Sequence, residues 1–357
     1  MRELFESTIE RLLADLVTPE LIRHCEAGHW PTELWAAIEE SGFAVAAAPE
    51  SLGGAEASWE NLYGVVKAAG RHNLPLPLPE TMLANWVLGL CGLKARNIPL
   101  GLTTHSTLAL GDLGVTGTLR DIPWGRHVEQ VVAVVSAGPG VSAVLAVLSR
   151  SDAEVTPKQN TAGEPRDDLC FNNATPLATA SLPAHVPADV LWWGGAMLRA
   201  AQMAGALEVT LDLSTRYATE RVQFGKPISS FQAIQHQLAQ MAQHTASATV
   251  SAEATFAESG DHLATWQIAA ARVCGAEAAG AVASMAHAVH GAIGFTHEHA
   301  LQLGTRRLWA WRSEFGNLGH WAQRLGRAVA LGGAASLWPA VTHGHLAALA
   351  SPQEPTP

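Results

Sequence analysis

The sequence predicts a mostly α-helical protein with a small β domain in the middle of the chain. Residues 1 to about 98 place apolar side chains at helical spacing. Residues about 99–184 hold short apolar segments rich in Val and Thr, and residues about 185–357 are rich in Ala and Leu with few internal prolines. We therefore expect three domains in the order helices, strands, helices, at 1–98, 99–184 and 185–357.

The N-terminal domain is expected to be helical around four apolar-periodic segments. These are Thr8–Asp15, the stretch around Leu34 and Ile38, Trp59–Ala69 and Thr81–Leu90. Leu and Pro alternate over Leu74–Pro79, and each proline removes an amide donor, so this stretch is predicted to be non-helical.

The middle domain is predicted to be a small antiparallel β domain, because its apolar segments are short and separated by turn residues. The predicted strands are Thr107–Leu110, Val115–Leu119, Val128–Val135 and Val141–Leu148. The polar stretch Gln159–Asp168 is expected to form a surface loop.

The C-terminal domain is predicted to contain four long helices. The apolar pattern places them at about 190–217, 230–258, 262–290 and 318–337. A four-helix bundle is the simplest way to bury their apolar faces.

Composition excludes several classes of protein. The 357 residues are 48% hydrophobic with a net charge of -10, which favours a globular protein and argues against a surface that binds nucleic acid. The apolar stretch Val131–Leu148 contains Gly-Pro-Gly and suits paired strands better than a membrane span. None of the four cysteines has CxxC spacing, so we expect no zinc site and no disulfide framework, and a cytoplasmic location. They are Cys25, Cys91, Cys170 and Cys274.

One long motif carries a family resemblance. Residues Tyr217–Gln232 read YATERVQFGKPISSFQ, a helix end followed by an Arg-x-x-Phe-Gly loop, a Pro-Ile turn and Phe-Gln. This closely resembles the signature of the acyl-CoA dehydrogenase superfamily. Two further parts of the chain resemble that family: the turn Ala48–Gly54 with its later Pro-rich stretch Asn73–Pro79, and the Gly-rich segment His290–Thr296. The predicted α–β–α order also matches.

The resemblance implies an FAD cofactor and an oligomer whose sites span subunit interfaces. In the family, the Arg and the Phe of this motif contact a cofactor bound mainly to a neighbouring subunit. The implied cofactor-binding residues here are Arg221, Gln223, Phe224, Gln232 and Gly291. An Arg suits a pyrophosphate, and a Gly lets the backbone approach a cofactor closely. The alternatives are a surface ion pair for the Arg, a core position for the Phe, solvated glutamines and an ordinary turn for the Gly.

The implied reaction is α,β-dehydrogenation of an acyl-CoA, which needs a carboxylate as general base. In most family members the base is a Glu directly before a Gly, and that position falls on Phe315 here. Glu314 lies one residue earlier, a rotation of about 100° on a helix. Glu314 is nevertheless the best candidate for the base, with an ion-paired Glu as the alternative. The position used by a minority of members lies within Trp192–Ala196, which contains no carboxylate.

The β domain also departs from the family. The stretch that corresponds to the family's flavin-contacting Thr-Glu-Pro segment, Leu102–Thr107, lacks the Glu-Pro. In the displaced Glu and the missing Glu-Pro, the chain resembles bacterial hetero-oligomeric members of the family that act in steroid catabolism. In those assemblies one subunit type is degenerate. Three hypotheses follow: an active dehydrogenase of lipid metabolism, a non-catalytic partner that completes the FAD site of a homologous subunit, or a different flavin-dependent oxidation. The implied partners are an acyl-CoA, a homologous subunit and electron-transfer flavoprotein as a candidate electron acceptor.

Overall fold

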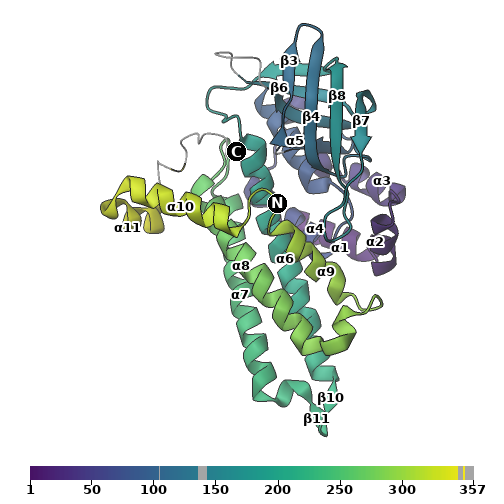
Figure 1. Ribbon diagram of the computed structural model, residues 1–357, viewed down its shortest axis with the longest axis vertical. Helices are drawn as coiled ribbons and strands as arrows, with labels where there is room; N and C mark the ends of the chain where they lie inside the picture. Colours follow the sequence, from purple (N-terminus) through teal and green to yellow (C-terminus); the bar gives the residue numbers. More distant parts are fainter. Residues whose placement is uncertain (104, 136–142, 345–348, 350–357) are drawn as a thin grey trace.

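The computed structural model describes residues 1–103, 105–135, 143–344 and 349 of the chain. It shows an elongated helical bundle with a β domain at one end and further helices beside that end (Figure 1). The order of elements along the chain is helices, strands, helices, as predicted.

The N-terminal part contains five α-helices and two short 3-10 helices. They are α1 (Arg2–Leu16), α2 (Pro19–Glu26), α3 (Thr32–Ser41), η1 (Phe43–Val45), η2 (Glu50–Leu52), α4 (Trp59–Arg71) and α5 (Leu78–Leu90). Helix α2 was not predicted, although Thr18 caps it by accepting a hydrogen bond from Leu21 N. The expectation of a non-helical Leu74–Pro79 was wrong at its end, because α5 starts at Leu78. Pro79 lies in the first turn, where no helical amide donor is needed.

The strands of the β domain form two sheets. Their bounds are β1 (Leu100–Leu102), β2 (His105–Ser106), β3 (Ala109–Gly111), β4 (Gly114–Pro123), β5 (Gln130–Val135), β6 (Val144–Ser149), β7 (Ala153–Thr156), β8 (Arg166–Ala174) and β9 (Ala178–Ser181), with η3 (Arg150–Asp152) between β6 and β7. One sheet has the order β1-β5-β6-β9, and the other has β2-β4-β8-β7 with β3 on β4.

Two predictions for the β domain need correction. The domain is not wholly antiparallel, because β1 pairs with β5 in parallel. The predicted loop Gln159–Asp168 ends early, because β8 begins at Arg166 and its residues Asp167 and Asp168 pair with β4 and β7. Strands β5 and β6 do pair as expected, with Val132 opposite Val147. The first two residues of the predicted strand Val141–Leu148 lie outside the described residues.

The C-terminal part contains the helical bundle and an outlying arm. Its elements are α6 (Val190–Glu220), β10 (Val222–Gln223), β11 (Lys226–Pro227), η4 (Ile228–Ser230), α7 (Gln232–Ala257), α8 (Thr265–His290), η5 (Gly291–Phe295), α9 (Leu301–Trp311), α10 (Leu318–Gly332) and α11 (Ala334–His343). Helices α6, α7 and α8 pack on one another, α9 packs on α6, and α10 packs on α8. The short α9 was not predicted. The predicted fourth helix stops at Gly332, because Gly333 has φ +75°.

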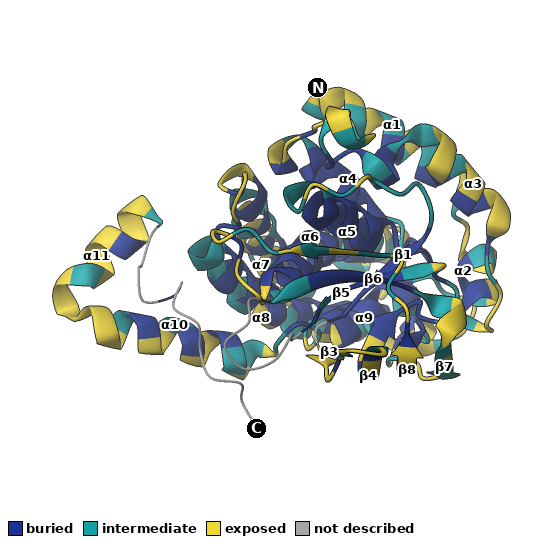
Figure 2. Cartoon of the chain, turned by 90° about the horizontal axis from the view of Figure 1, so that it is seen from above, coloured by how far each residue is buried: buried dark blue, intermediate teal, exposed yellow. Residues whose placement is uncertain are grey.

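The central helices and the outlying helices differ in how far they are buried. Helices α4, α5 and α6 are mostly buried in the centre of the molecule, whereas α10 and α11 project from it with much of their surface exposed (Figure 2).

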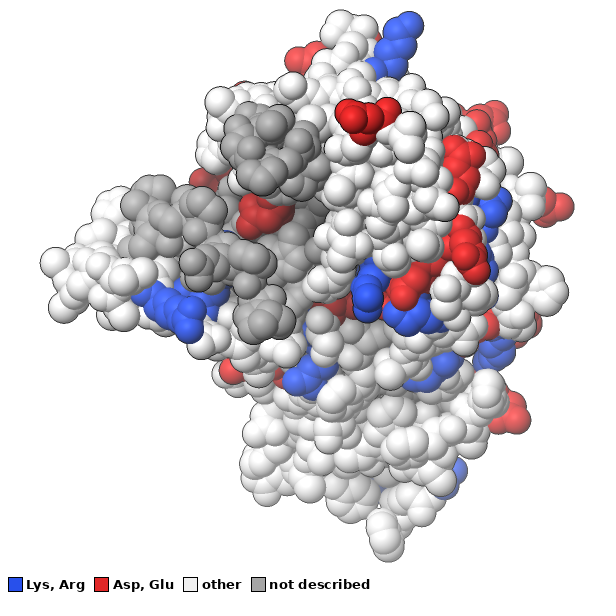
Figure 3. Space-filling model, turned by 45° about the horizontal axis from the view of Figure 1, so that its top comes forward, with Lys and Arg blue, Asp and Glu red and all other residues white. Residues whose placement is uncertain are grey.

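The stretch Thr265–Phe295 is long and apolar enough for a membrane span, but it lies in the bundle and 56% of its most apolar window is buried. Basic and acidic side chains are interspersed on the face shown in Figure 3, and large areas of that face carry neither.

Candidate functional site

Four of the five residues implied to contact FAD lie on an exposed hairpin at the far end of the bundle (Figure 1). We call residues 221–232 the Arg221 hairpin. Strands β10 and β11 pair antiparallel, with Gln223 opposite Lys226. Phe224 and Gly225 form the turn with φ +52° and +79°, the left-handed pair that a tight hairpin turn requires.

The side chains of this hairpin have few partners within the chain. Phe224 is 92% exposed, so it is not a core residue, and its ring lies edge to face with that of Phe231, with 6.0 Å between the ring centres. Arg221, Gln223 and Gln232 are exposed, and no carboxylate among the described residues lies within ion-pair distance of Arg221. Such an exposed aromatic and an unpaired guanidinium suit contact with another molecule.

Gly291 lies towards the same end of the bundle. It ends α8 with φ +63°, and an added Cβ would meet nothing within 4 Å. The ring of Tyr217, in the last turn of α6, stacks on the ring of His290, with 4.5 Å between the ring centres. This contact joins the end of α6 to the end of α8. The structure therefore groups the five implied cofactor residues at one solvent-exposed end, and their contact with FAD stays a prediction.

The structure brings together the two parts of the chain that correspond to the family's positions for the general base, Phe315 and the stretch 192–196. Phe315 is 8% exposed, and its ring lies directly against Gly195 on α6. A Cβ added at Gly195 would be 2.0 Å from Phe315 Cε1. Because the phenyl ring occupies the space beside Gly195, neither position offers a carboxylate or room for one.

Glu314 points elsewhere and is fully engaged by cations. Its Oε1 accepts hydrogen bonds from Arg166 Nε at 2.8 Å and Asn160 Nδ2 at 3.0 Å. Its Oε2 accepts from Arg199 Nε at 2.7 Å and Arg166 Nη2 at 3.1 Å. Burial alone would raise the pKa of Glu314, but Arg166 and Arg199 outweigh it and hold that pKa far below the usual range. A carboxylate with so low a proton affinity is a weak base, which argues against the sequence-based prediction for Glu314.

These ion pairs continue through the interior as a chain of alternating charges. Arg199 also donates to Glu80 at 2.7 Å, and Arg166 donates to Glu164 at 2.9 Å. Arg307 Nε in turn lies 3.2 Å from Glu164 Oε1. We call this set the Glu314 network; its members are Glu80, Glu164, Arg166, Arg199, Arg307 and Glu314. It joins α5, the β domain, α6 and α9.

Sequence reasoning missed every member of the network except Glu314, although one signal was present. Arg199 is the lone charged residue in the apolar run Val190–Leu207. A charge inside such a run is rarely buried without a partner, so a buried acid could have been expected. Arg199 is 1% exposed, and Glu80 and Glu314 are its acidic partners.

Comparison with known proteins places the chain in a family. Residues 2–95 match the model of the acyl-CoA dehydrogenase N-terminal domain, and residues 194–318 match that of the C-terminal domain. The acyl-CoA dehydrogenase IpdE2 of Mycolicibacterium smegmatis is 30% identical over 319 residues, which cover 86% of this chain and 91% of that protein.

Solved structures show the same fold. The ChsE4-ChsE5 complex from Mycobacterium tuberculosis contains a chain with a TM-score of 0.80 and 23% identity, covering 92% of this chain and 97% of that one. The Tcur3481-Tcur3483 steroid ACAD gives a TM-score of 0.81 and 21% identity, covering 93% of this chain and 98% of that one. The predicted fold class is confirmed, and the chain belongs to the acyl-CoA dehydrogenase family.

Proposed function

We propose that this chain serves FAD-dependent α,β-dehydrogenation of an acyl-CoA as the partner subunit of an oligomer. In that oligomer a homologous subunit supplies the general base, and this chain completes its FAD site. The observation that carries the proposal is the contact between Gly195 and Phe315, which fills both family positions for the base with apolar groups.

The exposed end of the bundle fits a role toward a cofactor held by another subunit. Bound FAD would supply the hydride acceptor for the β-carbon. From this chain, the Arg221 guanidinium would form a charge-assisted pair with the pyrophosphate, and the Phe224 ring would cover apolar cofactor surface. Gln223 and Gln232 would donate to cofactor oxygens, and Gly291 would leave room for close approach.

The space around Gly195 does not fit a second reaction centre in this chain. Arg199 lies one turn after Gly195 on α6, and its guanidinium carbon is 5.4 Å from the centre of the Phe315 ring. The side chains of the Glu314 network pair with one another there. An acyl group could enter only if it broke buried ion pairs, which costs several kcal/mol.

The substrate class and the electron acceptor follow by analogy. The related Tcur3481-Tcur3483 protein is a steroid ACAD, which supports a bulky, steroid-type acyl-CoA for the assembly that contains this chain. Electron-transfer flavoprotein is the proposed electron acceptor, and the cytoplasm is the proposed location.

The test compares the chain alone with the chain in its assembly. Purified alone with excess flavin supplied during expression, the chain is expected to lack visible flavin absorbance. Co-purified with a homologous subunit that retains Glu-Gly at the base position, it is expected to be yellow and to bleach anaerobically with acyl-CoA. Arg221→Gln should lower the flavin content of that assembly, whereas Glu314→Gln should leave bleaching largely intact. Yellow chain alone that bleaches with acyl-CoA would refute the proposal.

A further inference from the structure

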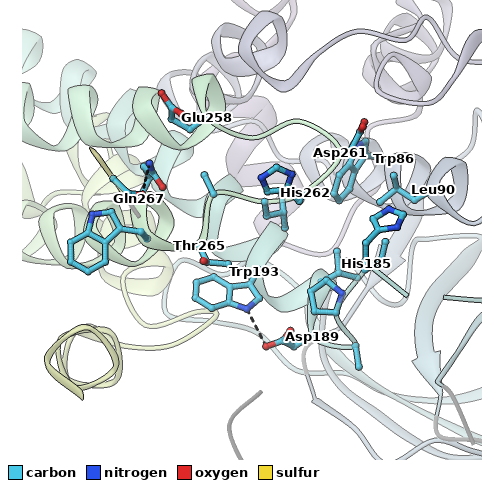
Figure 4. A pocket seen from close by; sticks show the side chains of 18 of the residues that line it. Trp86, Leu90, His185, Asp189, Trp193, Glu258, Asp261, His262, Thr265 and Gln267 are labelled. Atoms are coloured by element: carbon cyan, nitrogen blue, oxygen red, sulfur yellow. Dashed lines mark hydrogen bonds between the residues drawn. The ribbon is translucent and has the colours of Figure 1, made fainter. Parts of the chain in front are cut away.

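A large cavity lies on the opposite side of α6 from the base positions. Its volume is about 740 Å³, which is within the usual range for small-molecule sites. We call it the Trp193 cavity (Figure 4). It is enclosed by the end of α5, the start of α6, the α7–α8 connection, α10 and the end of α11.

The cavity is separate from the Glu314 network. From α6, Val190 and Trp193 line the cavity, whereas Gly195 and Arg199 face Phe315 and the network. Residues 193 and 195 differ by about 200° around a helix, so the two sets occupy opposite faces of α6. The cavity is therefore distinct from the positions considered for the general base.

The wall of the cavity is largely apolar and aromatic. Its apolar lining residues include Trp86, Leu90, Val190, Trp193 and Trp266. Indole rings offer broad apolar area with little conformational freedom to lose, so they suit a rigid or extended hydrocarbon body.

One buried cation in this wall lacks an adequate counter-charge. Arg324, on α10, is 9% exposed, and its Nε has no hydrogen-bond partner among the described residues. Among these residues, the acid that reaches it is Asp189, at 3.9 Å from Nη2, and Asp189 already accepts a hydrogen bond from Trp193 Nε1 at 3.0 Å. The guanidinium rests on the Trp193 ring, 4.4 Å from the centroid. A buried charge is costly unless paired, so this guanidinium is a binding point for an anion.

The other charged residues of the wall should interact less strongly with a ligand than Arg324 does. Asp189, Glu258 and Asp261 are exposed, as are His185 and His262. Glu258 and Asp261 lie along one edge of the view in Figure 4, and Asp189 lies on the opposite side, beside Trp193. Water and salt screen these exposed carboxylates, whereas the buried guanidinium is screened much less.

We propose that the Trp193 cavity binds an amphipathic carboxylate, with its hydrocarbon body against the tryptophans and its carboxylate paired with Arg324. The pair would give Arg324 a closer counter-ion than the described part of the chain provides. A guanidinium and a carboxylate can form two parallel hydrogen bonds, which favours a carboxylate over a single-point acceptor.

The probe for the test is cis-parinaric acid, a fluorescent fatty acid that accepts energy from tryptophan. Titrated into the full-length chain at neutral pH, it is expected to bind saturably at one site. Arg324→Gln should weaken binding about tenfold or more, and Arg324→Lys should restore part of the affinity. Leu90→Trp, which fills the cavity, should abolish binding. The matched control is Arg327→Gln, an exposed position on the same helix, and it should bind as the unaltered chain does.

Competition separates the carboxylate from the hydrocarbon. Laurate should displace the probe, and the neutral 1-dodecanol should do so at least about tenfold more weakly. Equal displacement by both would overturn the carboxylate assignment. Unsaturable binding, or binding unchanged in folded Arg324→Gln and Leu90→Trp chains as judged by circular dichroism, would overturn the site itself.

Discussion

Replacing Glu314 by Gln separates a catalytic from a structural role for this residue. The carboxylate holds two buried arginines, Arg166 and Arg199, which are 8% and 1% exposed at their side chains. Breaking a buried ion pair by removing one partner costs about 3–5 kcal/mol. We expect the lower end, about 3 kcal/mol, because Arg199 keeps Glu80 and Arg166 keeps Glu164.

The measurement is equilibrium urea unfolding followed by tryptophan fluorescence. Glu40→Gln on α3 is the matched control, because Glu40 is exposed and its loss should change the free energy of unfolding by less than about 0.5 kcal/mol. A base would behave in the opposite way: Glu314→Gln would leave stability intact and abolish turnover in the assembly. That outcome would refute the structural role.

The difference in the free energy of unfolding between the original chain and Glu314→Gln should depend on pH. The pKa of Glu314 is lowered in the folded chain from its usual 4.5. Its stabilisation is therefore fully present above pH 4.5 and is lost as the pH falls toward the folded pKa. Each pH unit below 4.5 should remove about 1.4 kcal/mol of the difference between the original chain and Glu314→Gln. A difference that stays constant down to pH 3 would contradict this linkage.

Three further predictions concern other parts of the chain. Phe224→Ala should leave the free energy of unfolding within about 0.5 kcal/mol, since the ring is 92% exposed, but should reduce flavin absorbance in the gel-filtered assembly; full retention would contradict the hairpin's role. Gly195→Ala should destabilise the chain by about 1–3 kcal/mol in urea unfolding through overlap with Phe315, and Phe315→Leu in the same chain should recover part of that loss; simple additivity would contradict the contact. Burial raises the pKa of Cys25 to about 11, so at pH 8 a disulfide reagent should modify exposed Cys170 far faster, as read by peptide mass spectrometry; comparable rates would show that Cys25 is accessible.

The long, periodic elements could be predicted from the sequence, and the short ones could not. Helices α6, α7 and α8 were expected within a few residues of their ends, because their apolar pattern runs over 26 residues or more. The eight-residue α2 and the eleven-residue α9 carry too few periods to stand out. Helix α5 was shortened in the prediction because prolines were counted as breakers, although the first turn tolerates them.

The residues of the candidate site also differ in how far the sequence could predict them. The Arg221 hairpin is contiguous, so one motif reveals it. The Glu314 network is assembled from residues far apart, for example Arg199 and Glu80 at a separation of 119 positions. A single sequence can indicate that a charge in an apolar helix needs a partner, but it cannot tell which acid reaches it. The contact between Phe315 and Gly195 depends likewise on how the turn after α9 folds back on α6.

That turn is held by a cation from a third helix. Arg272 on α8 is fully buried, and its Nη2 donates to the carbonyl oxygens of Trp311, Glu314 and Gly316, at 3.1, 2.6 and 3.0 Å. These acceptors are main-chain atoms, which every amino acid supplies. These three hydrogen bonds therefore do not depend on which side chains stand at these positions. In the partner-subunit role proposed above, such a loop could carry inert side chains in place of reactive ones while it keeps the outline that a companion subunit must recognise.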